Sequence, residues 1–97
     1  MIASLSVEAE RELIDAAIYY AEHGGPDLGL AFIAEFERTL GVLCDHPHLG
    51  PVWRGKSRRF PLRRFPNSVI YRLRTDELYV VALAHQRRRP TYWSDRQ

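Results

Sequence analysis

The sequence predicts an α+β fold in which a short N-terminal strand and an α-helical hairpin pack on a C-terminal antiparallel sheet. The prediction depends on two patterns of apolar residues, one in each half of the chain. Apolar residues recur every three or four positions over residues 7–44, whereas apolar and polar residues alternate over residues 58–84. The length of 97 residues and the hydrophobic share of 45% fit one globular domain, residues 1–97.

The first helix is expected from Val7 to Glu22, after a short strand at residues 1–5. Ser6 can cap its N-terminus, and the Gly24-Gly25 pair can end it. Its predicted buried face consists of Leu13, Ile14, Ala17, Ile18 and Ala21. Its opposite, charged face consists of Glu8, Arg11, Glu12, Asp15 and Glu22.

A second helix is expected to begin at Pro26 and to end near Cys44, before the His46-Pro47 pair. Its buried stripe consists of Leu28, Phe32, Phe36, Leu40 and Leu43. Because only two glycines separate the helices, they are predicted to form an antiparallel hairpin of two similar lengths.

The second half of the chain predicts a loop at residues 46–56 and then three strands in an antiparallel meander. The strands are expected at residues 58–65, 68–74 and 78–84. The last strand is apolar on both faces, which favours a central position. The tail, residues 85–97, has no periodicity and is expected to lie along the surface.

Individual side chains in this half can also be placed. Val69, Tyr71 and Leu73 are expected to point inward from the middle strand, and Arg72 and Arg74 outward. Tyr92 and Trp93 are expected to hold the tail against the domain.

Charge is divided along the chain. Residues 1–45 contain nine acidic residues and two arginines, a net charge of −7, whereas residues 46–97 contain twelve Lys and Arg and three acidic residues, a net charge of +9. The basic stretch without an acidic residue contains Arg54, Lys56, Arg58, Arg59, Arg63, Arg64, Arg72 and Arg74. Such a surface can contact a nucleic acid or an acidic protein, or it can be a solvated sheet face neutralised by the acidic helices.

Several function classes have no support in the sequence. There is no glycine-rich phosphate loop and no serine-hydrolase motif. Cys44, His46 and His48 could bind zinc, but their spacing is unusual and a fourth ligand is not evident, so no metal and no cofactor are expected. A single cysteine, no apolar run of membrane-spanning length and no signal peptide predict a cytoplasmic protein without membrane contact.

One catalytic hypothesis remains open. A metal-free ribonuclease needs a base, an acid and cations around the phosphate, and His85, Tyr92 and the arginines at positions 87–89 could fill these roles. The alternative is structural, with His85 closing the last strand and the aromatic side chain capping the core.

The motifs, taken in order, resemble the RelE/ParE superfamily of toxins from type II toxin-antitoxin systems, over nearly the whole chain. They are Tyr19-Tyr20 in the first helix, Cys-Asp-His-Pro-His-Leu-Gly (44–50), Arg-Arg-Phe-Pro-Leu-Arg-Arg-Phe-Pro (58–66), Val-Ile-Tyr-Arg (69–72) and Val-Ala-Leu-Ala-His-Gln-Arg-Arg-Arg-Pro-Thr-Tyr-Trp (81–93). The resemblance implies a growth-inhibiting toxin held inactive in a hetero-oligomer with a cognate antitoxin. Plasmid stabilisation, stress response and phage defence all stay open as its role.

Members of the superfamily differ in the cellular target that they attack. The long helical hairpin and the His85-x-Arg87 pattern are closer to the ParE branch, whose members inhibit DNA gyrase rather than act as enzymes. One alternative that the resemblance leaves open is a RelE-like endoribonuclease that cuts mRNA on the ribosome, with His85, Arg64 and Tyr92 as its candidate catalytic residues. The other is a non-toxic interaction module of the same fold. The residues expected to contact the target or partner are Arg58, Arg59, Arg63, Arg64, Arg72, Arg74, His85 and Arg87.

Overall fold

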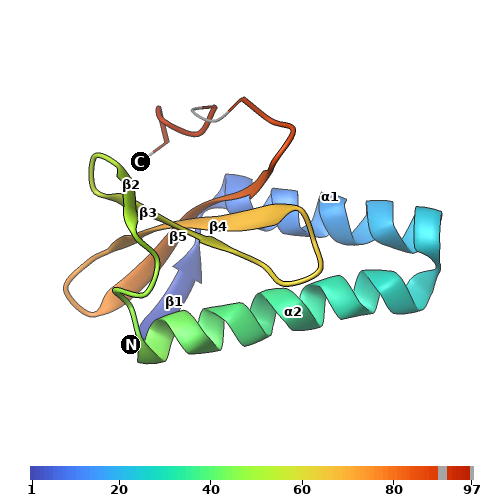
Figure 1. Cartoon of the computed structure of the whole chain (residues 1–97), viewed down its shortest axis with the longest axis horizontal. Helices are drawn as coiled ribbons and strands as arrows, with labels where there is room; N and C mark the ends of the chain where they lie inside the picture. Colours follow the sequence, from blue (N-terminus) through green and yellow to red (C-terminus); the bar gives the residue numbers. More distant parts are fainter. Residues whose placement is uncertain (90–91, 97) are drawn as a thin grey trace.

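The computed structural model describes residues 1–89 and 92–96 and has two layers, a helical hairpin and a five-stranded sheet (Figure 1). The helices are α1 (Val7–Gly24) and α2 (Pro26–Asp45). The strands are β1 (Ile2–Leu5), β2 (Val52–Arg54), β3 (Ser57–Pro61), β4 (Asn67–Leu73) and β5 (Glu77–His85). The predicted fold class is confirmed.

The ends of the helices follow from their capping residues. Ser6 Oγ accepts the backbone N–H of Ala9 at 3.0 Å, which satisfies one of the free amides of the first turn of α1. Gly25 adopts a φ of 94° between the helices, and Pro26 then opens α2. Neither helix in the described part of the chain is long and apolar enough to cross a membrane.

The buried face of α1 differs from the predicted face. Ala17 is buried, but Ile14 and Ile18 are 50% and 51% exposed, so their predicted burial is wrong. The reason is the close approach of the helices: a Cβ on Gly29 of α2 would lie only 2.8 Å from the carbonyl oxygen of Ala17. The small residues of α1 therefore face α2, and the larger isoleucines are turned outward. Glu12, predicted to face solvent, is half-buried instead.

The buried stripe of α2 is confirmed. Phe32, Phe36 and Leu43 are buried, and Leu28 and Leu40 pack against the same core. This core lies between the hairpin and the sheet and also contains Val69, Tyr71, Leu78 and Val80.

The sheet has the strand order β1-β5-β4-β3-β2, so β5 is an interior strand between β1 and β4, and the middle strand is β4. Strands β2 to β5 pair antiparallel, but β1 pairs with β5 in parallel, which makes the sheet mixed. The predicted loop at residues 46–56 is wrong in part, because residues 52–54 form β2. Gly55, with a φ of 54°, allows the tight turn that pairs β2 with β3.

The strand expected at residues 58–65 ends early, at Pro61. Arg64 has a φ of 70°, a left-handed conformation that cannot continue a strand. Arg63 and Arg64 therefore lie in the loop between β3 and β4, not on the sheet. Arg74 likewise lies beyond the end of β4, and Arg72 is half-buried rather than free in solvent.

A bulge divides the side chains of β5 between two faces. Ile70 of β4 pairs with Ala82 and Tyr71 pairs with Val80, so Val81 is an extra residue. Val81 and Ala82 consequently both join a second apolar cluster, on the sheet face opposite the helices. We call the sheet face opposite the helices the open face, because neither helix packs on it.

The C-terminal tail covers the open face, on the other side of the sheet from α2 (Figure 1). Trp93 is 2% exposed and packs on Ile70, Val81 and Ala82, with Tyr92 beside it. The predicted role of these two aromatic residues is confirmed, although the parts of the predicted tail at residues 90, 91 and 97 lie outside the described residues.

Candidate functional site

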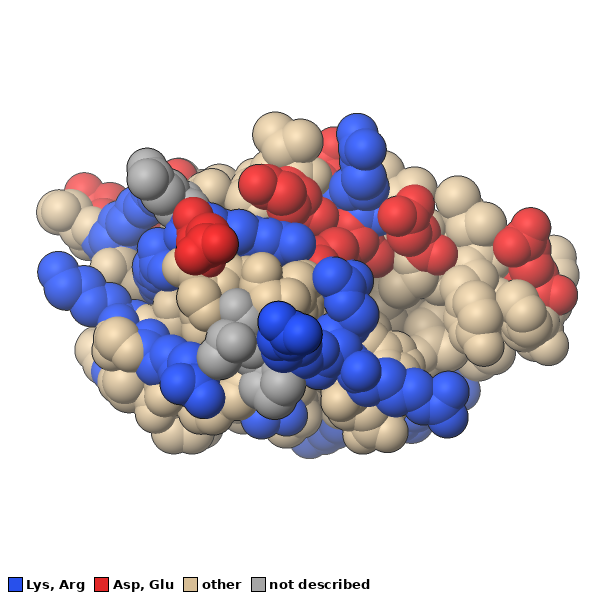
Figure 2. Space-filling model, turned by 90° about the horizontal axis from the view of Figure 1, so that it is seen from above, with Lys and Arg blue, Asp and Glu red and all other residues tan. Residues whose placement is uncertain are grey.

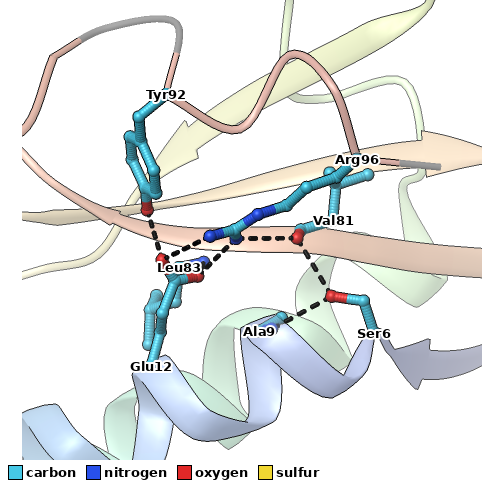
Figure 3. A network of polar contacts seen from close by, with 7 residues as sticks. All are labelled: Ser6, Ala9, Glu12, Val81, Leu83, Tyr92 and Arg96. Atoms are coloured by element: carbon cyan, nitrogen blue, oxygen red, sulfur yellow. Dashed lines mark hydrogen bonds and ion pairs between the residues drawn. The ribbon is translucent and has the colours of Figure 1, made fainter.

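Glu12 of α1 holds the tail in place (Figure 3). Its carboxylate accepts hydrogen bonds from the Tyr92 hydroxyl at 2.6 Å and from two nitrogens of Arg96 at 2.8 and 3.2 Å. The side chains of Glu12 and Arg96 are only 16% and 18% exposed. The three residues Glu12, Tyr92 and Arg96 therefore form a partly buried clasp between the first helix and the last residues of the chain.

The clasp also completes the edge of the sheet. Because β1 ends at Leu5 while β5 continues to His85, the edge of β5 beyond Val80 has no neighbouring strand. The backbone N–H of Leu83 donates to Glu12 at 3.1 Å, and the Ser6 hydroxyl donates to the carbonyl of Val81 at 3.0 Å (Figure 3). Side chains of α1 thus replace the missing strand and satisfy its hydrogen-bonding groups.

The clasp makes the Tyr92 hydroxyl a weaker acid by raising its pKa. Burial, reinforced by the hydrogen bond and the negative charge of Glu12, raises the pKa of the Tyr92 hydroxyl above its ordinary value. The hydroxyl therefore gives up its proton less readily than a free tyrosine, and this proton is directed at a carboxylate inside the molecule.

His85 is fixed at the end of β5. Its Nδ1 accepts the backbone N–H of Arg87 at 3.0 Å, which leaves the proton of the neutral ring on Nε2. Nε2 can then donate to a ligand. His85 lines two hollows, one on the open face and one between α1 and the tail, and Tyr92 lines both as well.

Arg64 is the third candidate of the ribonuclease hypothesis. It does not line the hollows that His85 and Tyr92 share. It lies in the β3–β4 loop with its guanidinium 5.5 Å from the ring centre of Phe65, which packs in the core on the helix side of the sheet. Neither hollow lined by His85 is lined by Arg64. The structure thus places His85 and Tyr92 together but leaves Arg64 apart.

Two arginines of the open face stack on aromatic rings. Arg59 of β3 lies 4.7 Å from the ring centre of Trp53, and its Nε donates to Ser68 Oγ at 3.4 Å. Arg88 of the tail lies 4.0 Å from the ring centre of Tyr92. An arginine stacked in this way keeps its charge and presents the edge of its planar guanidinium to a partner.

The remaining predicted contact residues are more dispersed. Arg58 donates to the backbone carbonyl of Gly50 at 2.8 Å and therefore supports the loop after α2. Arg72 donates to Ser57 Oγ at 2.9 Å, and Arg74 forms an ion pair with Glu77 at 3.2 Å. Arg63 and Arg87 are exposed.

Most of the positive charge is nevertheless uncompensated. Among the described residues, only Arg38, Arg74 and Arg96 form ion pairs. Figure 2 looks down on the tail and shows Lys and Arg side chains over much of this surface, with most Asp and Glu side chains in a band along one side. The division of charge along the sequence is therefore also a division of the surface.

The cysteine and histidines considered for zinc lie around the end of α2. Cys44 is half-buried near its last turn, and His46 and His48 are exposed in the loop that follows. Within residues 1–89 and 92–96, no three His, Cys, Asp or Glu side chains gather as metal ligands would.

The fold is shared with a solved protein of a toxin-antitoxin system. A solved structure described as the chromosomal ParDE TA system from P. aeruginosa has a chain that superposes with a TM-score of 0.77 and 19% sequence identity. The match covers 88% of this chain and 95% of that one, and at this identity it establishes the shared fold alone. No curated protein is significantly similar in sequence.

The family itself is established by sequence. Residues 3–90 match the model of the ParE toxin of the type II toxin-antitoxin system parDE. The chain belongs to this family, which confirms the resemblance seen in its motifs.

Sequence reasoning missed the roles of Glu12, Arg96 and Trp53. A signal for Glu12 was available, since it lies three residues after Ala9 and four before Ala16, on the side of α1 that is buried. Arg96 and Trp53 offered no comparable signal, because their contacts join segments far apart in the chain.

Proposed function

We propose that this ParE toxin inhibits DNA gyrase by binding it, without catalysing a reaction, and that a cognate antitoxin neutralises it in a hetero-oligomer. The observation that supports a binding mode of action is the state of Tyr92. Its hydroxyl is bound to Glu12 at 2.6 Å and has a raised pKa, so it is unsuited to acid-base catalysis near neutral pH. Arg64 lines neither of the hollows that Tyr92 lines.

Expression in cells tests the target. The chain is induced without the neighbouring open reading frames, and gyrase-dependent DNA cleavage and ribosome-dependent mRNA cleavage are both measured. Gyrase-dependent cleavage with intact mRNA is the expected result. Cuts in mRNA mapped by primer extension would replace the proposal with the ribonuclease alternative, and normal growth would favour a non-toxic interaction module.

Two substitutions separate binding from catalysis. Tyr92→Phe keeps the ring beneath Arg88 but removes the hydroxyl, and His85→Ala removes the imidazole. If either group performed acid-base chemistry, its removal would lower the rate by about a hundredfold to ten-thousandfold. We expect Tyr92→Phe to retain most of the toxicity, measured as the inducer concentration that halves growth, with the amount of protein checked by immunoblot.

The outer face of the hairpin supports neutralisation by an antitoxin. Ile14, Ile18 and Tyr19 of α1 are 50%, 51% and 54% exposed, and Leu30 of α2 is 65% exposed. Exposed apolar side chains of this size mark a surface suited to a protein partner. A disordered antitoxin segment would need such anchors to offset the entropy lost when it becomes ordered.

This interface can be tested separately from toxicity. Ile18→Lys should leave the toxin active but weaken its rescue by the co-expressed antitoxin, since it places a charge in the apolar contact. Val52→Lys is the matched control, because Val52 is 56% exposed but lies on the edge strand β2. Equal rescue of both variants would place the antitoxin elsewhere.

A further inference from the structure

We propose that the open face holds a site for two neighbouring phosphates of one nucleic-acid strand, in two hollows that meet at Trp93. The first hollow is lined by Arg59, Ser68, His85 and Arg88 together with aromatic rings. The second is lined by Arg54, Lys56 and Arg72. Trp93 lines both hollows and lies between them.

The first hollow has the donors that a phosphate group requires. Arg59 and Arg88 are each held by an aromatic ring, at 4.7 Å from Trp53 and 4.0 Å from Tyr92, so their planar guanidinium groups are oriented before any ligand arrives. Neither forms an ion pair with a described residue. Their charge is therefore available to an external anion.

Two neutral donors complete this hollow. Ser68 Oγ is buried and accepts a hydrogen bond from Arg59, so its own proton can be donated to a ligand. The neutral ring of His85 carries its proton on Nε2, because Nδ1 accepts the N–H of Arg87. Serine hydroxyls, ring N–H groups and arginine forks are the donors that commonly bind phosphate oxygens.

The second hollow makes a strand a better ligand than a lone phosphate ion. Lys56 and Arg54 are exposed, and Arg72 is held by Ser57 at 2.9 Å. No Asp or Glu is among the described residues that line either hollow. Two adjacent cationic hollows without an acidic side chain match the repeated charge of a phosphodiester backbone.

The two arginines of the tail, Arg88 and Arg96, differ in whether an acidic residue neutralises them. Arg96 lies on the same tail, yet Glu12 neutralises it at 2.8 Å. Glu12 is thus bound to Arg96, whereas Arg88 has an aromatic neighbour and no ion pair among the described contacts. On this tail, Arg96 has a structural role, whereas Arg88 can bind a ligand.

Fluorescence anisotropy with the purified full chain tests the proposal. The probe is a labelled oligothymidylate of about 12 nucleotides, which offers phosphates with little sequence information. We expect Arg59→Gln and Arg88→Gln each to weaken binding about tenfold, as expected for the loss of a hydrogen bond to a charged group. Each should also reduce the slope of log affinity against log salt by about 0.7.

The matched control is Arg11→Gln, which makes the same change in net charge on an exposed position of α1. It should change the affinity by less than about twofold. Arg59→Lys keeps the charge but removes the planar fork, so an intermediate loss is expected. Thermal unfolding of every variant confirms that the fold is retained.

Lys56→Gln tests the second hollow, and its loss of affinity should add to that of Arg59→Gln on a logarithmic scale. Three results would overturn the proposal: no binding by the unaltered chain at low salt, equal losses for Arg11→Gln and Arg59→Gln, or no effect of Lys56→Gln. A phosphopeptide that binds more tightly than oligothymidylate and oligouridylate would also overturn it in favour of a protein ligand.

Discussion

The two faces of the sheet are both apolar at their centres, but they are covered in different ways. On the helix side, Phe32 is fully buried between two aromatic neighbours, Tyr20 and Phe65, each 5.0 Å away between ring centres. On the open face, Trp93 is 2% exposed but belongs to a tail attached chiefly through the clasp to Glu12. The comparison teaches that the helix side supplies most of the stability. The open face is covered by the tail and carries arginines that form no ion pair among the described residues.

The largest expected effect lies on the helix side. Phe32→Ala should lower the free energy of unfolding by about 4 kcal/mol, because it leaves a cavity that the hairpin and sheet cannot close. Denaturation in urea followed by circular dichroism measures the loss. Leu30→Ala, 65% exposed on the same helix, is the control and should cost less than about 1 kcal/mol. Similar losses for the two variants would mean that this face is not the stabilising one.

The next effect is at the clasp that joins the two faces. Glu12→Ala should cost about 3 kcal/mol, since it leaves Arg96 without its partner in a partly buried site and the N–H of Leu83 without an acceptor. Glu10→Ala removes the same charge from an exposed position of α1 and serves as the control.

A double-mutant cycle sharpens this test. If the clasp acts as a unit, Arg96→Ala should add little to the loss already caused by Glu12→Ala. Fully additive losses would show instead that Glu12 stabilises the protein mainly through β5 and not through the tail.

Local patterns predicted much of the fold. Ser6, Gly25 and Pro26 determine the ends of the helices through capping and backbone preferences that need no distant partner. The buried stripe of α2 likewise follows from periodicity, and the interior position of β5 follows from a strand that is apolar on both faces. The parallel pairing of β1 could not be read in this way, because pairing depends on contacts between residues about 75 positions apart.

The site was less predictable for a related physical reason. The density of arginines was visible, but only the fold shows which guanidinium groups meet a carboxylate, as Arg96 does, and which meet a ring, as Arg59 does. The misplacement of Ile14 and Ile18 has a similar origin. Two faces of α1 are apolar, and the close approach at Gly29 decides which one is buried.

A smaller effect is expected on the open face. Trp93→Ala should cost about 2 kcal/mol, less than a core aromatic residue, because water can occupy the space of a side chain that covers only one surface. Loosening of the tail should also speed trypsin cleavage after Arg87 and Arg88, which are already exposed. Trp93→Phe is the control: its smaller ring keeps the cover, and it removes an indole N–H that has no hydrogen-bond partner among the described residues.

The smallest expected effect depends on pH and lies at the edge of the helix layer. Hydrogen bonds from Arg38, reinforced by the backbone N–H of Arg63, lower the pKa of Glu35 from 4.5 to about 2. A carboxyl whose pKa is lowered by folding stabilises the protein above its unfolded pKa and loses that contribution as the pH falls towards its folded pKa. The contribution of Glu35, about 1 kcal/mol for a pair near the surface, should therefore be complete above pH 4.5 and decline as the pH falls towards 2.

Urea denaturation at several pH values checks this prediction with Glu35→Gln. The variant should be less stable than the unaltered chain at pH 6, and the difference should shrink as the pH is lowered through this window. Glu37→Gln, exposed on the same helix, should show no such convergence. If the difference in the free energy of unfolding stays constant as the pH falls from 4.5 towards 2, Glu35 stabilises the β3–β4 loop through hydrogen bonds that survive protonation. The link between the hairpin and this loop would then not depend on charge.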